Sequence, residues 1–271
     1  MVVLASAGCF DLFAVPGVQV SPDGNTVYFL TGANVSMDSM AGTSLSSVGI
    51  GGGQPTALTT GSQTDLTSAF AVNPTNGDLA VTDIFGFSGA GGIELYANAS
   101  GSPTRISNPA QYEYYFDGYD SNGNLFADGW SYPSFTFTIS EIPAGSGSMN
   151  TVSISGGTPV FPGMVQWYRN GNYLAVGDQE CGFSAASCVY WYAISGSTAT
   201  YTGVTDLSSY LGGPVTDMVQ GVIAANNEKY LAGGDAGGGT VNRFMWDAGG
   251  SPTNYNNSTV VEPIGAAIST K

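Results

Sequence analysis

Histidine is absent from this sequence of 271 residues, and its absence excludes several kinds of chemistry. Without an imidazole the chain cannot form a Ser-His-Asp or Cys-His nucleophile system. It also lacks the commonest protein ligand of zinc, copper and non-haem iron. Any chemistry therefore depends on carboxylates, tyrosines, lysines, a thiol, or a hard cation held by oxygen atoms.

Charged side chains are scarce, at 9% of the sequence, and basic ones are the scarcest. Five Lys and Arg against 20 Asp and Glu give a net charge of −15. This balance disfavours nucleic acid and anionic membranes as partners, because both are bound by clusters of Lys and Arg. An acidic surface attracts cations such as Ca²⁺, although it also serves solubility alone. No apolar run approaches the ~18 residues of a membrane span, so no transmembrane segment is predicted.

The sequence has only three cysteines. Cys181 and Cys188, in QECGFSAASC, predict a small loop closed by a disulfide, which indicates a secreted, extracellular or periplasmic protein. Cys9 is left over as a buried apolar residue or a free thiol. Around it, MVVLASAGCF resembles the end of a lipoprotein signal with Cys9 as its anchor, while the alternative is a β-strand over residues 2–5. We expect an export signal to lie outside this sequence.

Glycine is abundant, with 40 residues, and it occurs in a repeated unit. Each unit has a short apolar strand, a tight turn rich in Gly, Asn and Asp, and a second apolar strand. Five copies occupy residues 18–34, 70–83, 116–129, 165–178 and 221–235. Their second strands end at Asn34, Asp83, Asp128, Asp178 and Asp235, about 45–57 residues apart, which is the length of a four-stranded propeller blade.

The two ends of the chain complete this pattern. EPIGAAIST (262–270) is typical of a first strand, and VVLASAG (2–8) of a second, with FDLFAVP following as a third. The prediction is a single all-β domain over residues 1–271, a six-bladed β-propeller closed by both termini. The approximate blades are 16–61, 62–109, 110–157, 158–209, 210–261, and 262–271 plus 1–15. A five-bladed ring with stray ends and a β-sandwich are the alternatives.

The motifs AVNPTNGDLAVTD, YDSNGNLFADG and NGNYLAVGD resemble NHL-repeat propellers and, more loosely, two other six-bladed families. These are the gluconolactonase (regucalcin-like) and streptogramin-lyase-like families. The resemblance extends over nearly the whole chain and implies architecture more than activity. The gluconolactonase-like resemblance implies a divalent metal held by a Glu and Asn or Asp residues at the channel, but AVPGVQVSP lacks the expected Glu. A streptogramin lyase would need a catalytic His, so that activity is excluded.

The segment QYEYYFDGYD (111–120) breaks the repeat and places Glu113, Asp117 and Asp120 among aromatic residues. Asp117 takes a place that is apolar in the first two copies, and a polar residue at a core position indicates a functional site. Asp117, Glu113 and Asp120 are predicted metal ligands, for Ca²⁺ if a cation is bound. Asp117 and Glu113 are also the candidate catalytic residues, although no enzyme class is assigned.

Glutamines extend this polar group in later copies. Gln166 is assigned the same place as Asp117, and Gln220 lies near it in the fifth copy. The hypothesis is a polar cluster at the central channel that binds Ca²⁺ or a small ligand. The alternative is a hydrogen-bonded network or a hydrated channel.

Surface candidates lie in the loops. Trp130 and Tyr132, in DGWSYPS, are suited to stacking on sugars, although Trp130 could instead pack between blades. Glu180, in the segment stapled by the disulfide, is a further candidate for ligand binding, because such loops carry binding in rigid scaffolds, although a disulfide is first of all a staple. The recurring Asp83, Asp128, Asp178 and Asp235 would form a cation-attracting rim, or would each accept backbone N–H bonds in the following turn.

Three functions remain open from the sequence. The first is a secreted binding protein that recognises a glycan, peptide or surface partner through one face. The second is a lactonase-like hydrolase with Asp117, Glu113 and Gln166 around a Ca²⁺-type ion. The third is a structural component of a cell surface.

Overall fold

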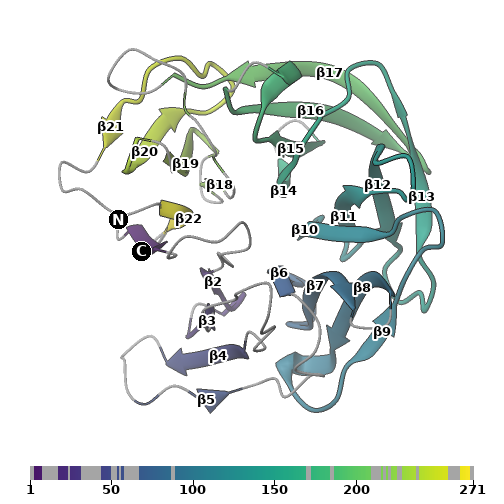
Figure 1. The fold of residues 1–271 in the computed structure, drawn as a ribbon. Coiled ribbons are helices and arrows are strands. Elements are labelled where there is room, and N and C mark those ends of the chain that lie inside the picture. Colours follow the sequence, from purple (N-terminus) through teal and green to yellow (C-terminus); the bar gives the residue numbers. More distant parts are fainter. Residues whose placement is uncertain are drawn as a thin grey trace. The chain divides into compact units, whose positions relative to one another are not determined.

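The computed structural model shows an all-β fold, with 22 strands and two short 3₁₀ helices among the residues that it describes (Figure 1). It describes residues 3–7, 18–23, 25–31, 44–49, 54, 56–57, 67–86, 89–168, 172–183, 186–208, 215, 218, 221–224, 228–235, 238–255 and 263–268. Its contacts divide the chain into two compact units, residues 10–152 and residues 1–9 with 153–271. In the described part of the chain, no helix is long and apolar enough to cross a membrane.

The unit of residues 10–152 is built from antiparallel strands that pair in sequence order (Figure 1). One sheet contains β2 (Val18–Val20), β3 (Thr26–Thr31), β4 (Ser44–Gly49) and β5 (Thr56–Ala57). The next contains β6 (Thr67–Val72), β7 (Leu79–Gly86), β8 (Gly89–Tyr96) and β9 (Thr104–Ile106), with η1 (Ala97–Ala99) after β8. The last has β10 (Glu113–Tyr119), β11 (Leu125–Trp130) and β12 (Phe137–Ile142), followed by β13 (Asn150–Ser155).

The chain passes into the second unit within β13. Residues 150–152 pair with β12, and residues 153–155 pair in parallel with β17 (Thr198–Asp206). β17 continues into β16 (Cys188–Ser195), β15 (Tyr173–Asp178) and β14 (Pro162–Tyr168), with η2 (Cys181–Phe183) between β15 and β16. A separate sheet contains β18 (Gly221–Ile223), β19 (Tyr230–Asp235), β20 (Thr240–Met245) and β21 (Asn254–Tyr255).

The terminal strands pair as the sequence predicted. β1 (Val3–Ala7) lies antiparallel to β22 (Pro263–Ile268) within the second unit, with Leu4 opposite Ala267. The third strand expected at FDLFAVP lies outside the described residues, as does Cys9. The predicted count of six blades is therefore not confirmed, although all five repeated hairpins are present as strand pairs.

Two features of the sequence favour these hairpins. Each turn contains residues that adopt tight backbone conformations, and the strands on either side have apolar side chains that are buried in the core. In the turn before β7, Gly77 has φ of +79°, in the left-handed region that favours glycine. Beyond it, Leu79 and Val81 pack with Phe70 and Tyr96 in one buried cluster. Burying each such side chain contributes about 1.5–3 kcal/mol. Local turn chemistry and strand burial therefore determine the same hairpin.

Candidate functional site

Five aromatic rings gather at one end of the β10–β12 sheet, and we call them the aromatic surface. They belong to Tyr112, Tyr115, Trp130, Tyr132 and Phe135. The rings of Tyr112 and Tyr132 are 5.0 Å apart, and the Tyr115 and Trp130 rings meet edge to face at 5.3 Å. Tyr132 is 63% exposed and Phe135 58%, the largest exposed fractions among the described large hydrophobic residues. Aromatic area of this size on a surface indicates a binding site.

A hydrogen-bonded turn between β11 and β12 holds the two exposed rings. The backbone N–H of Ser131 donates to the Thr136 carbonyl at 3.0 Å, and that of Phe135 donates to the Ser131 carbonyl at 3.1 Å. The Ser131 and Ser134 hydroxyls are 2.8 Å apart. Phe135 has φ of +48°, which bulky residues rarely adopt. Such a conformation persists only where the surroundings hold it, and the hydrogen bond from the Phe135 N–H to Ser131 is one of those restraints.

A buried amide network joins the start of β10 to β11 and β12, on the face that Ser140 shares with its paired residue Ala127. Gln111 donates from Nε2 to the Asp128 carbonyl at 2.9 Å, and the Ser140 hydroxyl donates to Gln111 Oε1 at 2.7 Å. Asn108 Nδ2 donates in turn to Ser140 Oγ at 3.1 Å. Next to Gln111, a Cβ at Gly129 would collide with the Glu113 carbonyl oxygen, so this backbone approach requires glycine. The side-chain amides of Gln111 and Asn108 are therefore bound within the buried part of this sheet.

Glu113 is the carboxylate of the aromatic surface. Tyr115 Oη donates to Glu113 Oε2 at 2.9 Å. Burial raises the pKa of Glu113, while the hydrogen bond from Tyr115 acts in the opposite direction. The pKa of Tyr115 is also raised, by burial first and then by the charge of Glu113. The pair can accept hydrogen bonds from a ligand hydroxyl beside the rings.

Asp117 lies on the other face of this sheet. Glu113 is paired with Trp130, and Asp117 with Ala127, three residues earlier in β11. Directly paired residues share a face and successive residues alternate, so Glu113 and Asp117 face opposite sides. A bulge between Tyr114 and Asp117 causes this reversal. Burial raises the pKa of Asp117 well above its usual value.

Asp120 serves its own turn. Its Oδ1 accepts the backbone N–H groups of Asn122 and Asn124 at 2.8 and 2.9 Å, and its Oδ2 accepts the Asn124 side-chain amide at 2.7 Å. The three carboxylates predicted as one metal site, Asp117, Glu113 and Asp120, do not meet. The correction follows from the bulge, which separates the first two, and from the turn, which uses the third.

Gln166 also needs a correction. It pairs with Ala175, the residue after Leu174, whereas Asp117 pairs with Ala127, two residues after Leu125. In the register of the repeated hairpin, Gln166 therefore lies one residue nearer the turn than the position that Asp117 occupies in β10. Its Nε2 donates to the Ile223 carbonyl at 2.9 Å, and its Oε1 accepts the Ile223 N–H at 2.7 Å. Gln220 lies outside the described residues.

A similar contact occurs in the other unit, where the amide bonds two residues of a strand rather than one, and we call both contacts clamps. Gln19 Nε2 donates to the Phe70 carbonyl at 2.6 Å, and Gln19 Oε1 accepts the Val72 N–H at 3.0 Å. In each case one amide satisfies two edge groups of a strand more than 50 residues away in sequence. These glutamines thus hold neighbouring first strands together.

Replacing Gln19 by alanine is expected to lower the free energy of unfolding by about 1–3 kcal/mol, because a strand-edge N–H and C=O lose their partner. Urea unfolding followed by tryptophan fluorescence measures the loss. Gln166→Ala should behave alike, since its amide makes the same pair of bonds. A neutral result for both variants would contradict the clamp.

The recurring aspartates bind backbone or an arginine. Asp128 Oδ1 accepts the Phe116 N–H at 2.8 Å, and Asp235 Oδ1 accepts the Gly238 N–H at 2.9 Å. Asp178 accepts three backbone N–H groups, and Asp83 pairs with Arg105 at 2.8 Å. The structural alternative, bonds to the following turn, is confirmed for Asp178 and Asp235, whereas Asp128 accepts an N–H group of the preceding strand β10.

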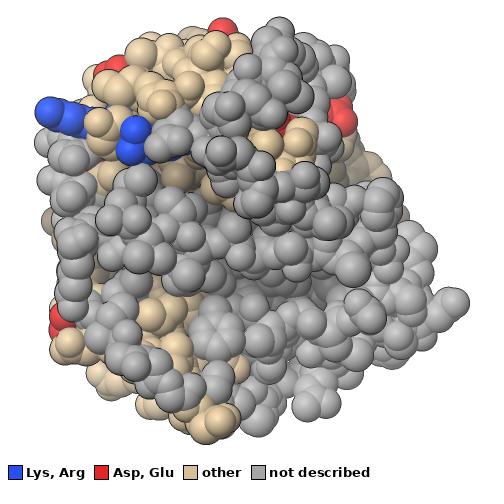
Figure 2. All heavy atoms as spheres, turned by 90° about the vertical axis from the view of Figure 1, so that its left-hand side faces the viewer, with Lys and Arg blue, Asp and Glu red and all other residues tan. Residues whose placement is uncertain are grey.

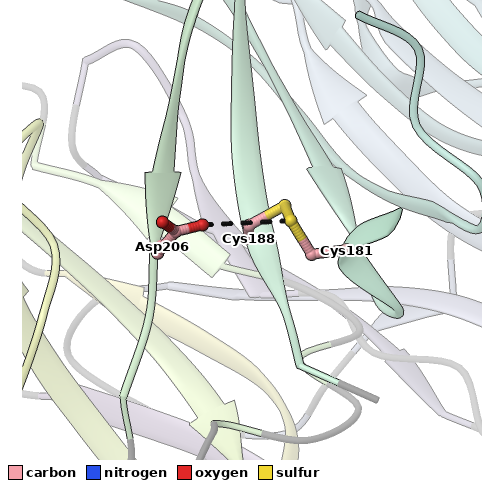
Figure 3. A group of neighbouring side chains, drawn as sticks. All are labelled: Cys181, Cys188 and Asp206. Atoms are coloured by element: carbon pink, nitrogen blue, oxygen red, sulfur yellow. Dashed lines mark hydrogen bonds between the residues drawn. A yellow bond between two sulfur atoms is a disulfide. The ribbon is translucent and has the colours of Figure 1, made fainter. Parts of the chain in front are cut away.

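The predicted disulfide is present between Cys181 and Cys188 (Figure 3). Asp206 lies beside it, with Oδ1 4.0 Å from Cys181 Sγ. These three residues form the only metal-ligand-like group in the described part of the chain, but sulfurs bonded to each other are not thiolate ligands. Glu180, in the same loop, donates its N–H to Asp178 Oδ1 at 3.0 Å.

Comparisons with known proteins find the fold and no family. No protein-family model matches the sequence, and no curated protein matches it. The structure is similar to a chain in a nidogen/laminin complex, with a TM-score of 0.69, 11% identity, and coverage of 93% of this chain and 83% of the other. A functionally unknown protein from Desulfotomaculum acetoxidans has a TM-score of 0.59 at 13% identity, covering 94% and 74%.

A third similar structure is a periplasmic gluconolactonase from Pseudomonas aeruginosa, with a TM-score of 0.56 and 9% identity, covering 93% and 72%. Propeller structures are thus among the neighbours, and the all-β, propeller-like fold is shown. Identities this low carry the fold and not the activity.

Proposed function

We propose that this protein is a secreted carbohydrate-binding propeller that recognises a neutral glycan through the aromatic surface. The observation that carries the proposal is the pair of exposed rings, Tyr132 and Phe135, held on a hydrogen-bonded turn beside Glu113. Sugar rings present apolar C–H faces that stack on aromatic rings, and hydroxyls that need polar partners. The Ser131 and Ser134 hydroxyls and the Glu113 carboxylate supply those partners.

The charge around these rings supports a neutral ligand. Residues 107–142 contain no Lys or Arg, so an anionic glycan would find no counter-charge in this segment. Figure 2 shows a different side of the molecule, the one on the left in Figure 1, where the described surface has a few Lys and Arg atoms and scattered Asp and Glu atoms. The disulfide supports folding in an oxidising compartment, where extracellular glycans occur.

The proposal is tested with the variants Tyr132→Ala and Phe135→Ala. Each should lower the affinity for a bound oligosaccharide by about tenfold or more, because central aromatic residues dominate such sites. A panel of neutral oligosaccharides, including gluco-, manno- and chito-oligomers, is screened on an array and then measured by calorimetry. Met245→Ala is the matched control, since Met245 is 40% exposed but lies outside the aromatic surface.

Binding that is equal in all three variants would contradict a role for these rings. Binding of a proline-rich peptide in place of every oligosaccharide would replace the glycan with another ligand of aromatic surfaces. Quenching or enhancement of Trp130 fluorescence by the ligand gives a second readout at the same place.

A metal-assisted hydrolase has one supporting observation, the buried and unpartnered carboxylate of Asp117. The other two residues proposed for this hydrolase site do not lie with Asp117. Glu113 belongs to the opposite face, and the Gln166 amide is bound to Ile223. We therefore place the binding function first.

A further inference from the structure

Asp117 is a buried carboxylate without a donor. Its side chain is 5% exposed, and neither Oδ atom has a hydrogen-bond partner in the described part of the chain. The two neighbouring carboxylates differ, since Asp120 accepts from Asn122 and Asn124 and Asp128 accepts from Phe116. A buried charge without a partner is among the costliest arrangements in a protein. Such a carboxylate is neutralised either by a proton, in line with its raised pKa, or by a bound cation.

The surroundings of Asp117 are apolar. Its paired residue Ala127 belongs to a buried cluster with Ala71, Ala80 and Leu125, so the face of β10 that carries Asp117 packs toward β6 and β7. Tyr119 packs against the same cluster. Burial and then the charges of Asp117 and Asp78 raise the pKa of Tyr119, so its phenol stays neutral and cannot supply a positive charge. Residues 107–142 contain no Lys or Arg.

The clamp glutamine is missing at this position. Ala71 pairs with Ala80, the residue after Leu79, as Gln166 pairs with Ala175, the residue after Leu174. Ala71 is thus the counterpart of Gln166, but it has a methyl group where the glutamine has an amide. No side chain from this position reaches the next first strand, β10.

The strand edge that a clamp would satisfy lies at Asp117. Phe70 and Val72, the residues bound by Gln19, pair with Val81 and Leu79. Their counterparts in β10 are Asp117 and Tyr119, which pair with Ala127 and Leu125. An edge strand leaves such backbone groups without a ladder partner. In the Gln19 pattern the Asp117 carbonyl is the acceptor at this edge, whereas in the Gln166 pattern both bonded groups belong to Ile223, the counterpart of Tyr119.

We propose that Asp117 binds a monovalent alkali cation, Na⁺ or K⁺, where Ala71 replaces the clamp glutamine. The ion adds a link between β10 and β6 to the hydrogen bonds that the Ser68 hydroxyl donates to the Tyr114 and Tyr115 carbonyls. One buried carboxylate is neutralised by one positive charge, whereas a divalent ion would leave a net charge in an apolar cluster. Hard cations prefer such oxygen ligands.

The test measures the melting temperature of the full chain in NaCl, KCl and tetramethylammonium chloride at equal ionic strength. Na⁺ or K⁺ should raise the melting temperature by about 2–4 °C over tetramethylammonium, because binding to the folded state alone stabilises it. Asp117→Asn should abolish this difference. Ala71→Gln should abolish it too, because the new amide can donate to Asp117 and occupy the same place.

Glu141→Gln is the matched control, since it removes one carboxylate from the same sheet and should keep the full difference between the salts. ²³Na NMR supplies a second measurement, with line broadening in the wild type that K⁺ displaces and that Ala71→Gln reduces. Equal melting temperatures in all three salts, or an unchanged difference in Asp117→Asn, would overturn the proposal. A larger stabilisation by Ca²⁺ at matched ionic strength would overturn the assignment to a monovalent ion.

Discussion

Replacing Asp178 by alanine is expected to lower the free energy of unfolding by about 3–5 kcal/mol. Asp178 is buried at the end of β15, where Oδ2 accepts the Val160 N–H at 2.9 Å. Oδ1 accepts the N–H groups of Phe161 and Glu180 at 3.1 and 3.0 Å. Alanine would leave three backbone donors without their acceptor in or near the core. Urea unfolding, extrapolated to water, measures the loss.

Two further variants define this effect. Asp178→Asn keeps one carbonyl oxygen and should cost less than alanine, because part of the acceptor set remains. Asp247→Asn removes an exposed charge from the same unit at a position with φ of +64°, which asparagine tolerates, and should change stability by less than about 0.5 kcal/mol. A loss below about 1 kcal/mol in Asp178→Ala would show that water satisfies these donors instead.

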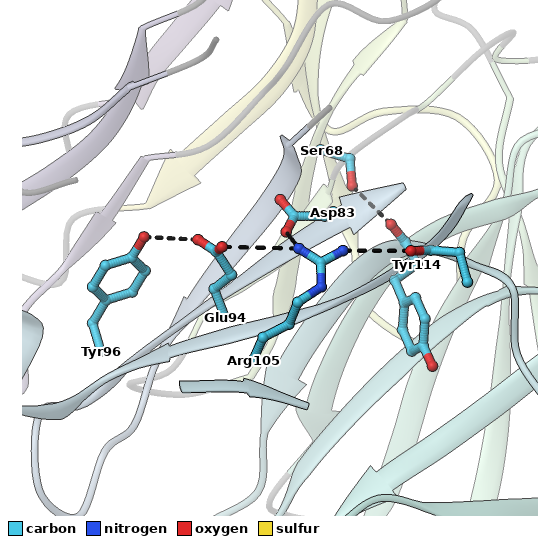
Figure 4. A network of polar contacts seen from close by, with 7 residues as sticks. Ser68, Asp83, Glu94, Tyr96, Arg105 and Tyr114 are labelled. Carbon is cyan, nitrogen blue, oxygen red and sulfur yellow. Dashed lines mark hydrogen bonds and ion pairs between the residues drawn. The ribbon is translucent and has the colours of Figure 1, made fainter. Parts of the chain in front are cut away.

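The second large effect is expected at Arg105, which stands between two carboxylates (Figure 4). Its Nη1 lies 2.8 Å from Asp83 Oδ2 and 3.9 Å from Glu94 Oε1. The Asp83 side chain is only 2% exposed, while that of Arg105 is 34% exposed. Arg105→Met keeps the length of the side chain and removes the charge. It should cost about 3 kcal/mol, the lower end for a broken buried pair, because the arginine is partly solvated.

A double-mutant cycle with Asp83→Asn separates the ion pair from packing. If the pair causes the loss, Arg105→Met should cost much less in the Asp83→Asn background, with a coupling energy of about 1–3 kcal/mol. Additive losses would assign the effect to the aliphatic part of Arg105. Thermal or urea unfolding of the four proteins provides the measurement.

The repeated hairpins could be predicted because their signals are local. The turn NPTNGD contains a glycine whose left-handed backbone suits the turn, and the residues on either side alternate toward a core. The disulfide of Cys181 and Cys188 is local as well, since seven residues separate the two cysteines. Pairing of the terminal strands could be predicted for a different reason. The repeat unit contains two strands, and each end of the chain contains only one of them.

Only part of the candidate site could be predicted from the sequence. Trp130 and Tyr132 follow a predicted strand, so they were identified as surface aromatics, whereas Phe135 was missed. Its outward ring depends on a positive φ that sequence patterns assign to glycine rather than phenylalanine. The adjoining Ser-Tyr-Pro-Ser is typical of a turn and was the one available sign.

Sequence alone determined the strand composition, the hairpin turns and the exclusion of histidine chemistry, because each depends on residue type and short spacing. The tertiary structure decided which side chains meet. In a regular strand Glu113 and Asp117 would share a face, but one bulge puts them on opposite faces. Gln19 and Gln166 bind strands more than 50 residues away, which no local pattern specifies. The bulge shifts the register of β10 by one residue, and this shift places the aromatic surface and the buried carboxylate of Asp117 on opposite faces of the sheet.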